Sequence, residues 1–198
     1  MPILESAKNV VKTPGESKFG GIKNKMYWVR KSLLSECPHL TPIGDRTTID
    51  QSKFLTGTFA FKENTDKFNS FEFDVNNGKL EWKSVGENPS ALLMELNFEM
   101  TISTLDASLY NFVEANMNED LILVLERANC SGERFMFGGC CLPATITAVE
   151  GGLGVDAKSF GGTKFTFLAY SNGLPPQLPA LLTLPVHGEE APGGGGGG

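Results

Sequence analysis

The 198-residue sequence has few of the residues from which enzyme active sites are usually built. It contains two His, four Cys, two Trp and three Tyr. His39 and His187 stand in proline-containing segments and form no Ser-His-Asp arrangement with other residues. No glycine-rich stretch has the G-x-x-x-x-G-K-[ST] spacing of a phosphate-binding loop. We therefore expect a protein that is not an enzyme and that needs no cofactor.

The cysteines form no C-x-x-C pair, and they stand at Cys37, Cys130, Cys140 and Cys141. Zinc sites usually draw their ligands from such pairs, and adjacent cysteines do not easily bond to each other. The pattern therefore predicts four reduced thiols and no metal site.

Long apolar runs are also missing, which predicts the absence of a membrane span. The first residues, MPILES, contain an acid and no apolar stretch, so they do not resemble a secretory signal. We therefore expect folding in the cytoplasm of the cell that makes the protein. A net charge of −6 argues against binding to nucleic-acid phosphates.

Charge is distributed unevenly along the chain. Residues 1–31 hold seven Lys or Arg against two Glu, a net charge of +5, which leaves −11 of the total of −6 for residues 32–198. Two interpretations remain open for this leading segment: a solvated tail, or an arm that docks on the acidic body of a neighbouring copy. The candidate inter-subunit contacts of such an arm are Lys8, Lys12, Lys18 and Lys23.

The sequence is rich in segments where apolar and polar residues alternate, and its fourteen Phe supply many of the apolar side chains. Residues 92–102, LLMELNFEMTI, place apolar side chains on one face of a strand and acids on the other. Residues 68–75 and 79–84 alternate around an Asn-Gly pair, which predicts a β-hairpin. Residues 121–125, LILVL, predict a strand buried on both faces. Further strands are expected at residues 26–34, 54–62, 134–137, 144–150 and 163–170.

The period changes from 2 to 3.6 after Ser103. A helix is predicted from about residue 104 to 117, and its core face consists of Leu105, Leu109, Phe112 and Val113. The resulting fold class is mainly β, a sandwich or barrel with one flanking α-helix. We expect three parts: an extended basic arm (residues 1–24), the β domain (residues 25–170) and a Pro/Gly-rich tail (residues 171–198). The apolar middle of that tail is expected to lie on a surface of this copy or of a neighbour.

The order of these elements from residue 79 to 177 resembles that of bacteriophage tail-tube (major tail) proteins, especially those of phages of Bacteroidetes. The resemblance lies in LLMELNFEMTI, which leads into the helix TLDASLYNFVEANMN, and in the strand DLILVLER. It continues in PATITAVEGGLG and TKFTFLAYSNGLPPQL, and the opening GGIKNKMYWVRKSLL also fits. The Cys140-Cys141 pair, the loop at residues 35–50 and the terminal glycines depart from the pattern.

The resemblance implies a structural subunit whose copies form rings, usually hexameric, that stack into a tube. DNA would pass through without specific binding, and the partners would be further copies of the chain and other tail proteins. The protein would reside in the virion tail after assembly in the host cytoplasm. Acids on alternating strands would repel DNA phosphates from the tube wall. The candidate lumen-facing acids are Glu72, Asp74, Glu81, Glu95 and Glu99.

Two further function classes remain open. One is another structural protein of a virion or injection machine, such as a tail terminator, baseplate or decoration protein. The other is a carbohydrate-binding β-sandwich, against which the missing secretory signal and the lack of clustered Trp argue.

Overall fold

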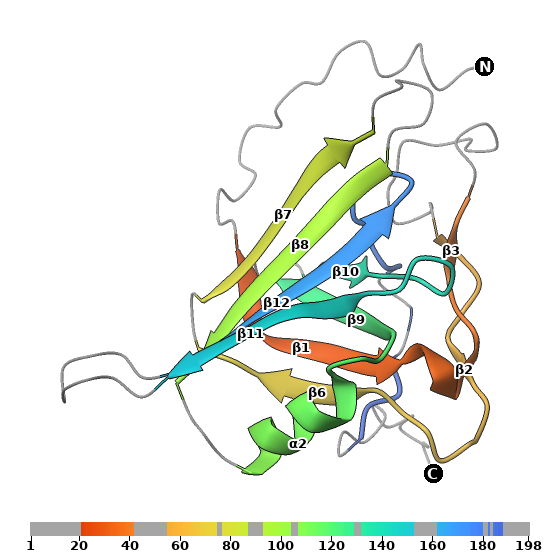
Figure 1. Ribbon diagram of the computed structural model, residues 1–198. Helices are drawn as coiled ribbons and strands as arrows, with labels where there is room; N and C mark the ends of the chain where they lie inside the picture. Colours follow the sequence, from red (N-terminus) through yellow and green to blue (C-terminus); the bar gives the residue numbers. More distant parts are fainter. Residues whose placement is uncertain are drawn as a thin grey trace.

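Two antiparallel sheets and one helix make up the body of the protein (Figure 1). The computed structural model describes residues 21–41, 55–74, 77–86, 93–103, 107–128, 132–152, 162–179, 182 and 184–187. The predicted class, mainly β with one α-helix, is confirmed. The described strands do not close into a barrel but form two facing four-stranded sheets and two small strand pairs.

The sheets are named here after their central strands. The β9 sheet consists of β10 (Arg134–Phe137), β9 (Leu121–Arg127), β1 (Ile22–Arg30) and β6 (Asn69–Glu72), in that order. The β8 sheet consists of β11 (Thr145–Gly152), β12 (Gly162–Ser171), β8 (Leu93–Ile102) and β7 (Gly78–Val85). The small pairs join β2 (Leu34–Glu36) to β5 (Ala60–Phe61) and β3 (His39–Leu40) to β4 (Leu55–Thr56). A short 3-10 helix, η1 (Lys31–Leu33), follows β1.

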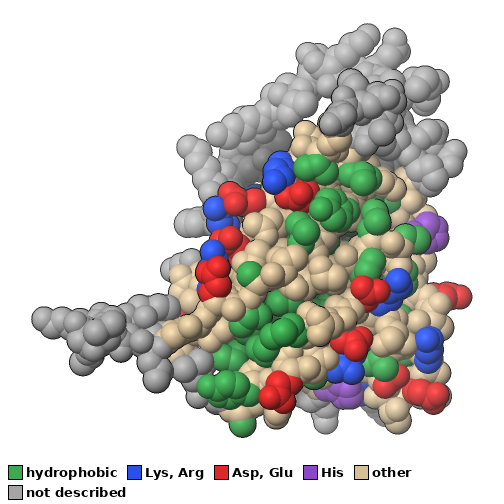
Figure 2. Space-filling model, in the orientation of Figure 1, with side chains coloured by type: hydrophobic (Ala, Val, Ile, Leu, Met, Phe, Trp, Pro, Cys, Tyr) green, Lys and Arg blue, Asp and Glu red, His purple; other side chains and the backbone are tan. Residues whose placement is uncertain are grey.

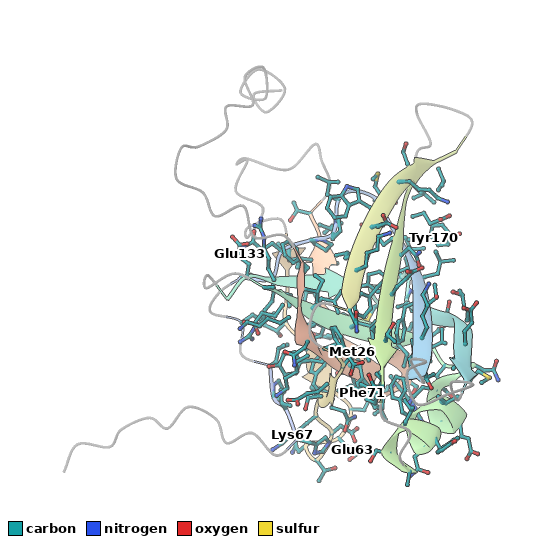
Figure 3. The ribbon with its side chains drawn as sticks, turned by 90° about the vertical axis from the view of Figure 1, so that its left-hand side faces the viewer. Met26, Glu63, Lys67, Phe71, Glu133 and Tyr170 are labelled. Atoms are coloured by element: carbon teal, nitrogen blue, oxygen red, sulfur yellow. A yellow bond between two sulfur atoms is a disulfide. The ribbon has the colours of Figure 1, made fainter. Side chains whose placement is uncertain are left out.

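The main core lies between the two sheets. On β8, the alternate residues Leu96, Phe98 and Met100 are buried, as the sequence pattern predicted. The ring of Phe98 stacks on that of Phe167 in β12, with a centroid distance of 5.7 Å. Figure 3 shows Met26 between the sheets, whereas Tyr170 points away from the core on the outer side of β12. Alternation along β8 and β12 therefore gives the sheet one buried face and one solvent-exposed face.

A second core covers the other face of the β9 sheet. Ile122 and Val124 of β9 are fully buried there, so the predicted strand with two buried faces is confirmed. Their cover includes Leu178, Leu184 and Val186 from the C-terminal segment. The apolar middle of the expected tail therefore packs on this copy's own body, which is one of the two surfaces expected for it.

The prediction of four reduced cysteines is wrong. Cys37 and Cys140 form a disulfide, with their Cα atoms 6.0 Å apart and a sequence separation of 103. Cys141 is an exposed free thiol, and Cys130 lies outside the described residues. The sequence did not reveal this bond because its partners meet only when the segment after η1 crosses the end of β10.

The predicted hairpin is not formed. β6 pairs with β1, and β7 pairs with β8, so the two alternating runs belong to different sheets. Gly78 allows a close approach between the sheets, because a Cβ there would lie 2.6 Å from the Phe73 ring. The Asn-Gly pair therefore lies where the chain crosses from one sheet to the other.

The helix α2 (Ala107–Asn116) closes one end of the main core (Figure 1). Of its predicted core face, Leu109 and Phe112 are buried and Val113 packs against the same cluster, while Leu105 lies outside the described residues. Sequence reasoning missed Asn116, which is completely buried. Its amide donates to the Phe112 carbonyl at 2.8 Å, and its oxygen accepts from Arg30 Nε at 3.0 Å.

Candidate assembly surface

The β8 sheet presents two unpaired edges within the described part of the chain. β7 pairs only with β8, and β11 pairs only with β12, and each edge strand is eight residues long. Edge strands of this length carry backbone N–H and C=O groups that can pair with another chain. The sheet is therefore open to extension at both sides.

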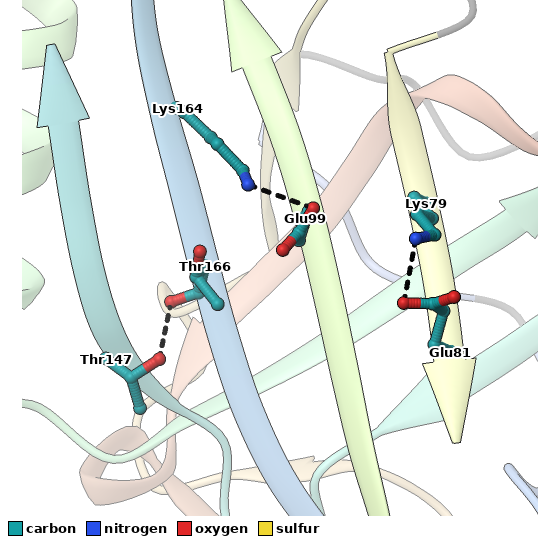
Figure 4. A network of polar contacts seen from close by, with 6 residues as sticks. All are labelled: Lys79, Glu81, Glu99, Thr147, Lys164 and Thr166. Carbon is teal, nitrogen blue, oxygen red and sulfur yellow. Dashed lines mark hydrogen bonds and ion pairs between the residues drawn. The ribbon is translucent and has the colours of Figure 1, made fainter. Parts of the chain in front are cut away.

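The outer face of the same sheet carries acids and lysines in alternation. The register places Lys79 opposite Glu99 and Lys83 opposite Glu95 on neighbouring strands. Ion pairs join Lys164 to Glu99 at 3.1 Å and Lys79 to Glu81 at 2.9 Å (Figure 4). A third ion pair joins Lys83 to Glu95 at 2.7 Å. Three of the predicted lumen acids, Glu81, Glu95 and Glu99, thus share one face, and each has a lysine partner.

The carboxylate partners of Lys79 and Lys83 favour the charged form of these two lysines. The hydrogen bond that Lys79 donates to Glu81, followed by the charge of Glu81, raises the pKa of Lys79 above its usual value. Glu95 raises the pKa of Lys83 in the same way. Both lysines therefore stay protonated, and the face carries nearly balanced charge rather than the acidic field that the sequence suggested.

One end of this face is apolar. Figure 2 shows hydrophobic side chains gathered toward the top of the sheet and charged side chains of both signs beside them. Val85 lies opposite Leu93 at this end, and Tyr170 lies opposite Glu95. Tyr170 is 37% exposed, so an aromatic ring is available to a partner there.

The other two predicted acids do not join this face. Glu72 is exposed on β6, opposite Lys25 of β1. Asp74 follows that strand and accepts a hydrogen bond from the Ser103 hydroxyl. All five acids alternate with apolar residues in the sequence, which suggested one common face. Glu72 and Asp74 are elsewhere because β6 belongs to the β9 sheet.

The arm residues are divided as well. Lys8, Lys12 and Lys18 lie outside the described residues. Lys23 belongs to β1, which begins at Ile22, and it forms an ion pair with Glu126 of β9. The predicted arm of residues 1–24 therefore includes three residues of the sheet, and Lys23 is a contact within the body.

The face also contains partners that sequence reasoning missed. These partners are Lys79, Lys83 and Lys164, which lie beside the acids on the same face. The alternation Lys79-Glu81-Lys83 was a usable signal, because side chains two apart share a face of a strand. The position of Lys164 beside Glu99 depends on pairing between β12 and β8, which local sequence does not specify.

Among the described residues, no group of His, Cys, Asp and Glu is arranged to hold a metal ion. The helices in this part of the chain are too short and too polar to cross a membrane.

Comparison of the chain with protein-family models, with curated proteins and with solved structures found no match.

Proposed function

We propose that the chain is a structural subunit of a phage tail tube, whose stacked rings conduct DNA into the host. The observation that carries the proposal is the β8 sheet, whose two edge strands of eight residues each have no further strand partner among the described residues. Long open edges promote association between copies, and monomeric proteins usually block or cover them. The order of elements, which resembles that of tail-tube proteins, supports the same function.

In this proposal β7 of one copy adds to β11 of the next. The two edges differ, so the contact is heterologous and can close into a ring. The resemblance favours six copies in a ring. At the apolar end of the face, Val85 lies on β7 itself with Leu93 opposite it on β8, and both would add buried area to the contact.

The outer face of the β8 sheet would then line the lumen. Its lysines and glutamates are already paired with each other, so the wall offers DNA phosphates few unpaired cations. Stable DNA binding requires neutralisation of several phosphates by Lys or Arg. We therefore expect DNA to slide through the lumen because the paired lysines attract its phosphates only weakly. Strong repulsion by unpaired acids is not required.

The disulfide bears on where the protein works. Disulfides persist in oxidising surroundings, which include the surface of a virion, and they are rare in the cytosol. We place the finished protein in the virion tail, assembled in the host cytoplasm, with the Cys37–Cys140 bond forming on or after release.

Negative-stain microscopy of the purified full-length chain tests the proposal, with light scattering over a range of concentrations. Rings or tubes are expected, and tubes distinguish a tail-tube subunit from a terminator, baseplate or decoration protein. A compact monomer at every concentration contradicts the proposal.

The disulfide favours a second candidate, a carbohydrate-binding sandwich of an oxidising compartment. This candidate requires a monomer that binds glycans. Binding of the monomer to a glycan array, together with the absence of rings, would support it.

A further inference from the structure

A groove opens at the β7 side of the sandwich, where β7 extends beyond the β9 sheet. Figure 3 looks onto this side of the molecule. The groove has a volume of about 360 Å³. We call it the Trp82 groove, and its lining residues include Gly21, Ile22, Leu80, Trp82, Phe135 and Leu174.

The groove exposes apolar side chains that face the core side of the sheet. Trp82 pairs in register with Leu96, which is buried, so both side chains project from the inner face of the β8 sheet. Nevertheless Trp82 is 50% exposed, and Leu174 in the same groove is 51% exposed. Adjacent apolar side chains left open in this way indicate a site that another segment covers.

The chain itself enters the structure at this groove. Gly21 lines it and is held by a hydrogen bond from the Ala128 N–H to the Gly21 carbonyl, at 3.0 Å. Consecutive Cα atoms are about 3.8 Å apart, so the Cα of Phe19 cannot be more than about 7.6 Å from that of Gly21. Between them stands Gly20, which has no side chain. Phe19 is therefore the first apolar side chain before the groove and cannot be far from it.

We propose that the Trp82 groove is the docking site for Phe19 of the same chain. The ring of Phe19 packs against Trp82 and Leu174 and completes the open side of the main core. A short tether keeps its side chain at millimolar effective concentration, so even a weak aromatic contact is well populated. No segment of a neighbouring copy has this advantage.

The docking fixes where the basic arm leaves the body. With Phe19 anchored at the groove, the residues before it must start at the β7 side. The docking itself takes place within one chain and does not depend on the proposed tail-tube function.

Tryptophan fluorescence tests the inference on dilute full-length protein. Trp28→Phe leaves Trp82 as the only tryptophan and retains an aromatic ring beside Phe112. In this background, Phe19→Ala should raise acrylamide quenching of Trp82 roughly twofold, because a packed ring leaves only one indole face open. The matched control is Leu4→Ala, which removes an apolar side chain far along the arm and should leave quenching unchanged.

A second measurement avoids the Trp28→Phe background. In the ¹H–¹⁵N spectrum of the otherwise unmodified protein, Phe19→Ala should shift one of the two indole N–H signals, and Leu4→Ala should shift neither. Unchanged quenching and unchanged indole signals with Phe19→Ala would overturn the inference. Quenching that decreases with protein concentration and ignores Phe19→Ala would also overturn it, because the occupant would then be a second copy. Both readouts report a contact within one chain, so a failure to form tubes leaves the test intact.

Discussion

Phe112 is the residue through which α2 is fixed to both sheets. Its ring contacts Trp28 of β1 at a centroid distance of 5.1 Å and Phe165 of β12 at 5.8 Å. It also contacts Phe71 of β6 at 4.9 Å. Such edge-to-face and tilted contacts add to the gain from burial.

We expect Phe112→Ala to lower the free energy of unfolding by about 3–5 kcal/mol, because it removes a buried ring and leaves a cavity. Urea denaturation measures the change. The matched control is Tyr110→Ala on the same helix, since Tyr110 is 59% exposed. A loss for Phe112→Ala no larger than for the control would mean that α2 does not pack as described.

Asn116 is a polar residue whose burial depends on its partners. It links the last turn of α2 to Arg30, which also donates from Nη2 to the Ala115 carbonyl at 2.8 Å. Asn116→Ala should lower the free energy of unfolding by about 1–3 kcal/mol, because it leaves the part-buried Arg30 Nε without this acceptor. Asn111→Ala, at an exposed position of the same helix, serves as the control in the same denaturation experiment. Equal stability of the two variants would contradict the assigned role of Asn116.

Among the elements, the segment from β2 to β5 depends most on cross-linking. Its strands are two or three residues long and pair only with each other in the described part of the chain. The Cys37–Cys140 disulfide ties this segment to the turn after β10.

Cys37→Ser should therefore lower the free energy of unfolding of the oxidised protein by about 2–5 kcal/mol, because the bond closes a long loop. Thermal denaturation with and without a reductant provides the measurement. A reductant should bring the unmodified protein to the stability of Cys37→Ser, and the control Cys141→Ser should not be destabilised. A reductant effect that remains in Cys37→Ser would assign the redox sensitivity to other cysteines.

The best-predicted strands are those whose burial follows from their own local sequence. β8 alternates over ten residues, and β9 is apolar from Leu121 to Leu125, so local pattern alone determines their burial. Phe98 faces the core and Glu99 faces outward for the same local reason. The acids and apolar residues of β8 were therefore assigned to the correct faces before any pairing was known.

Features that depend on pairing between distant segments were not predicted. The run at residues 68–75 suits a hairpin equally well, and only the preference of β6 for β1 over β7 decides against it. The disulfide, the lysine partners and the cover of β9 by Leu178 and Val186 likewise require the tertiary arrangement. Composition and period contain no information about which strands become neighbours.

At the scale of the whole molecule, one open question is whether the basic residues before β1 join neighbouring copies. Deletion of residues 1–20 should leave a folded body, because β1 begins at Ile22, and should abolish polymerisation if the basic segment joins copies. Circular dichroism checks the fold and electron microscopy checks assembly. Long tubes formed by the truncated chain would show that the arm is not the connector.

The double variant Glu95→Lys with Glu99→Lys tests whether the outer face of the β8 sheet lines the lumen. These changes break the pairs with Lys83 and Lys164 and make the outer face strongly basic. Because exposed ion pairs contribute only about 0–1 kcal/mol each, the fold should survive. Tubes should still form, but DNA should adhere to them and ejection should slow, most strongly at low salt.

The control for this pair is Glu36→Lys combined with Glu114→Lys, which makes the same change of charge at exposed positions away from the β8 sheet. DNA adhesion should be absent from the control tubes. If Glu95→Lys with Glu99→Lys prevents assembly while the control assembles, these acids lie at a contact between copies and do not line the lumen.

The cover of β9 by the C-terminal segment also sets an order of events during biosynthesis. The ribosome completes Ile122 and Val124 well before it reaches Leu178 to Val186, which bury them. At about 5–20 residues per second, this interval lasts roughly 3–13 s. Throughout it, the nascent chain exposes an apolar strand face beside other nascent copies on the same message. Chaperone supply and translation speed over this stretch should therefore determine how much protein reaches the soluble pool, even where the finished fold is stable.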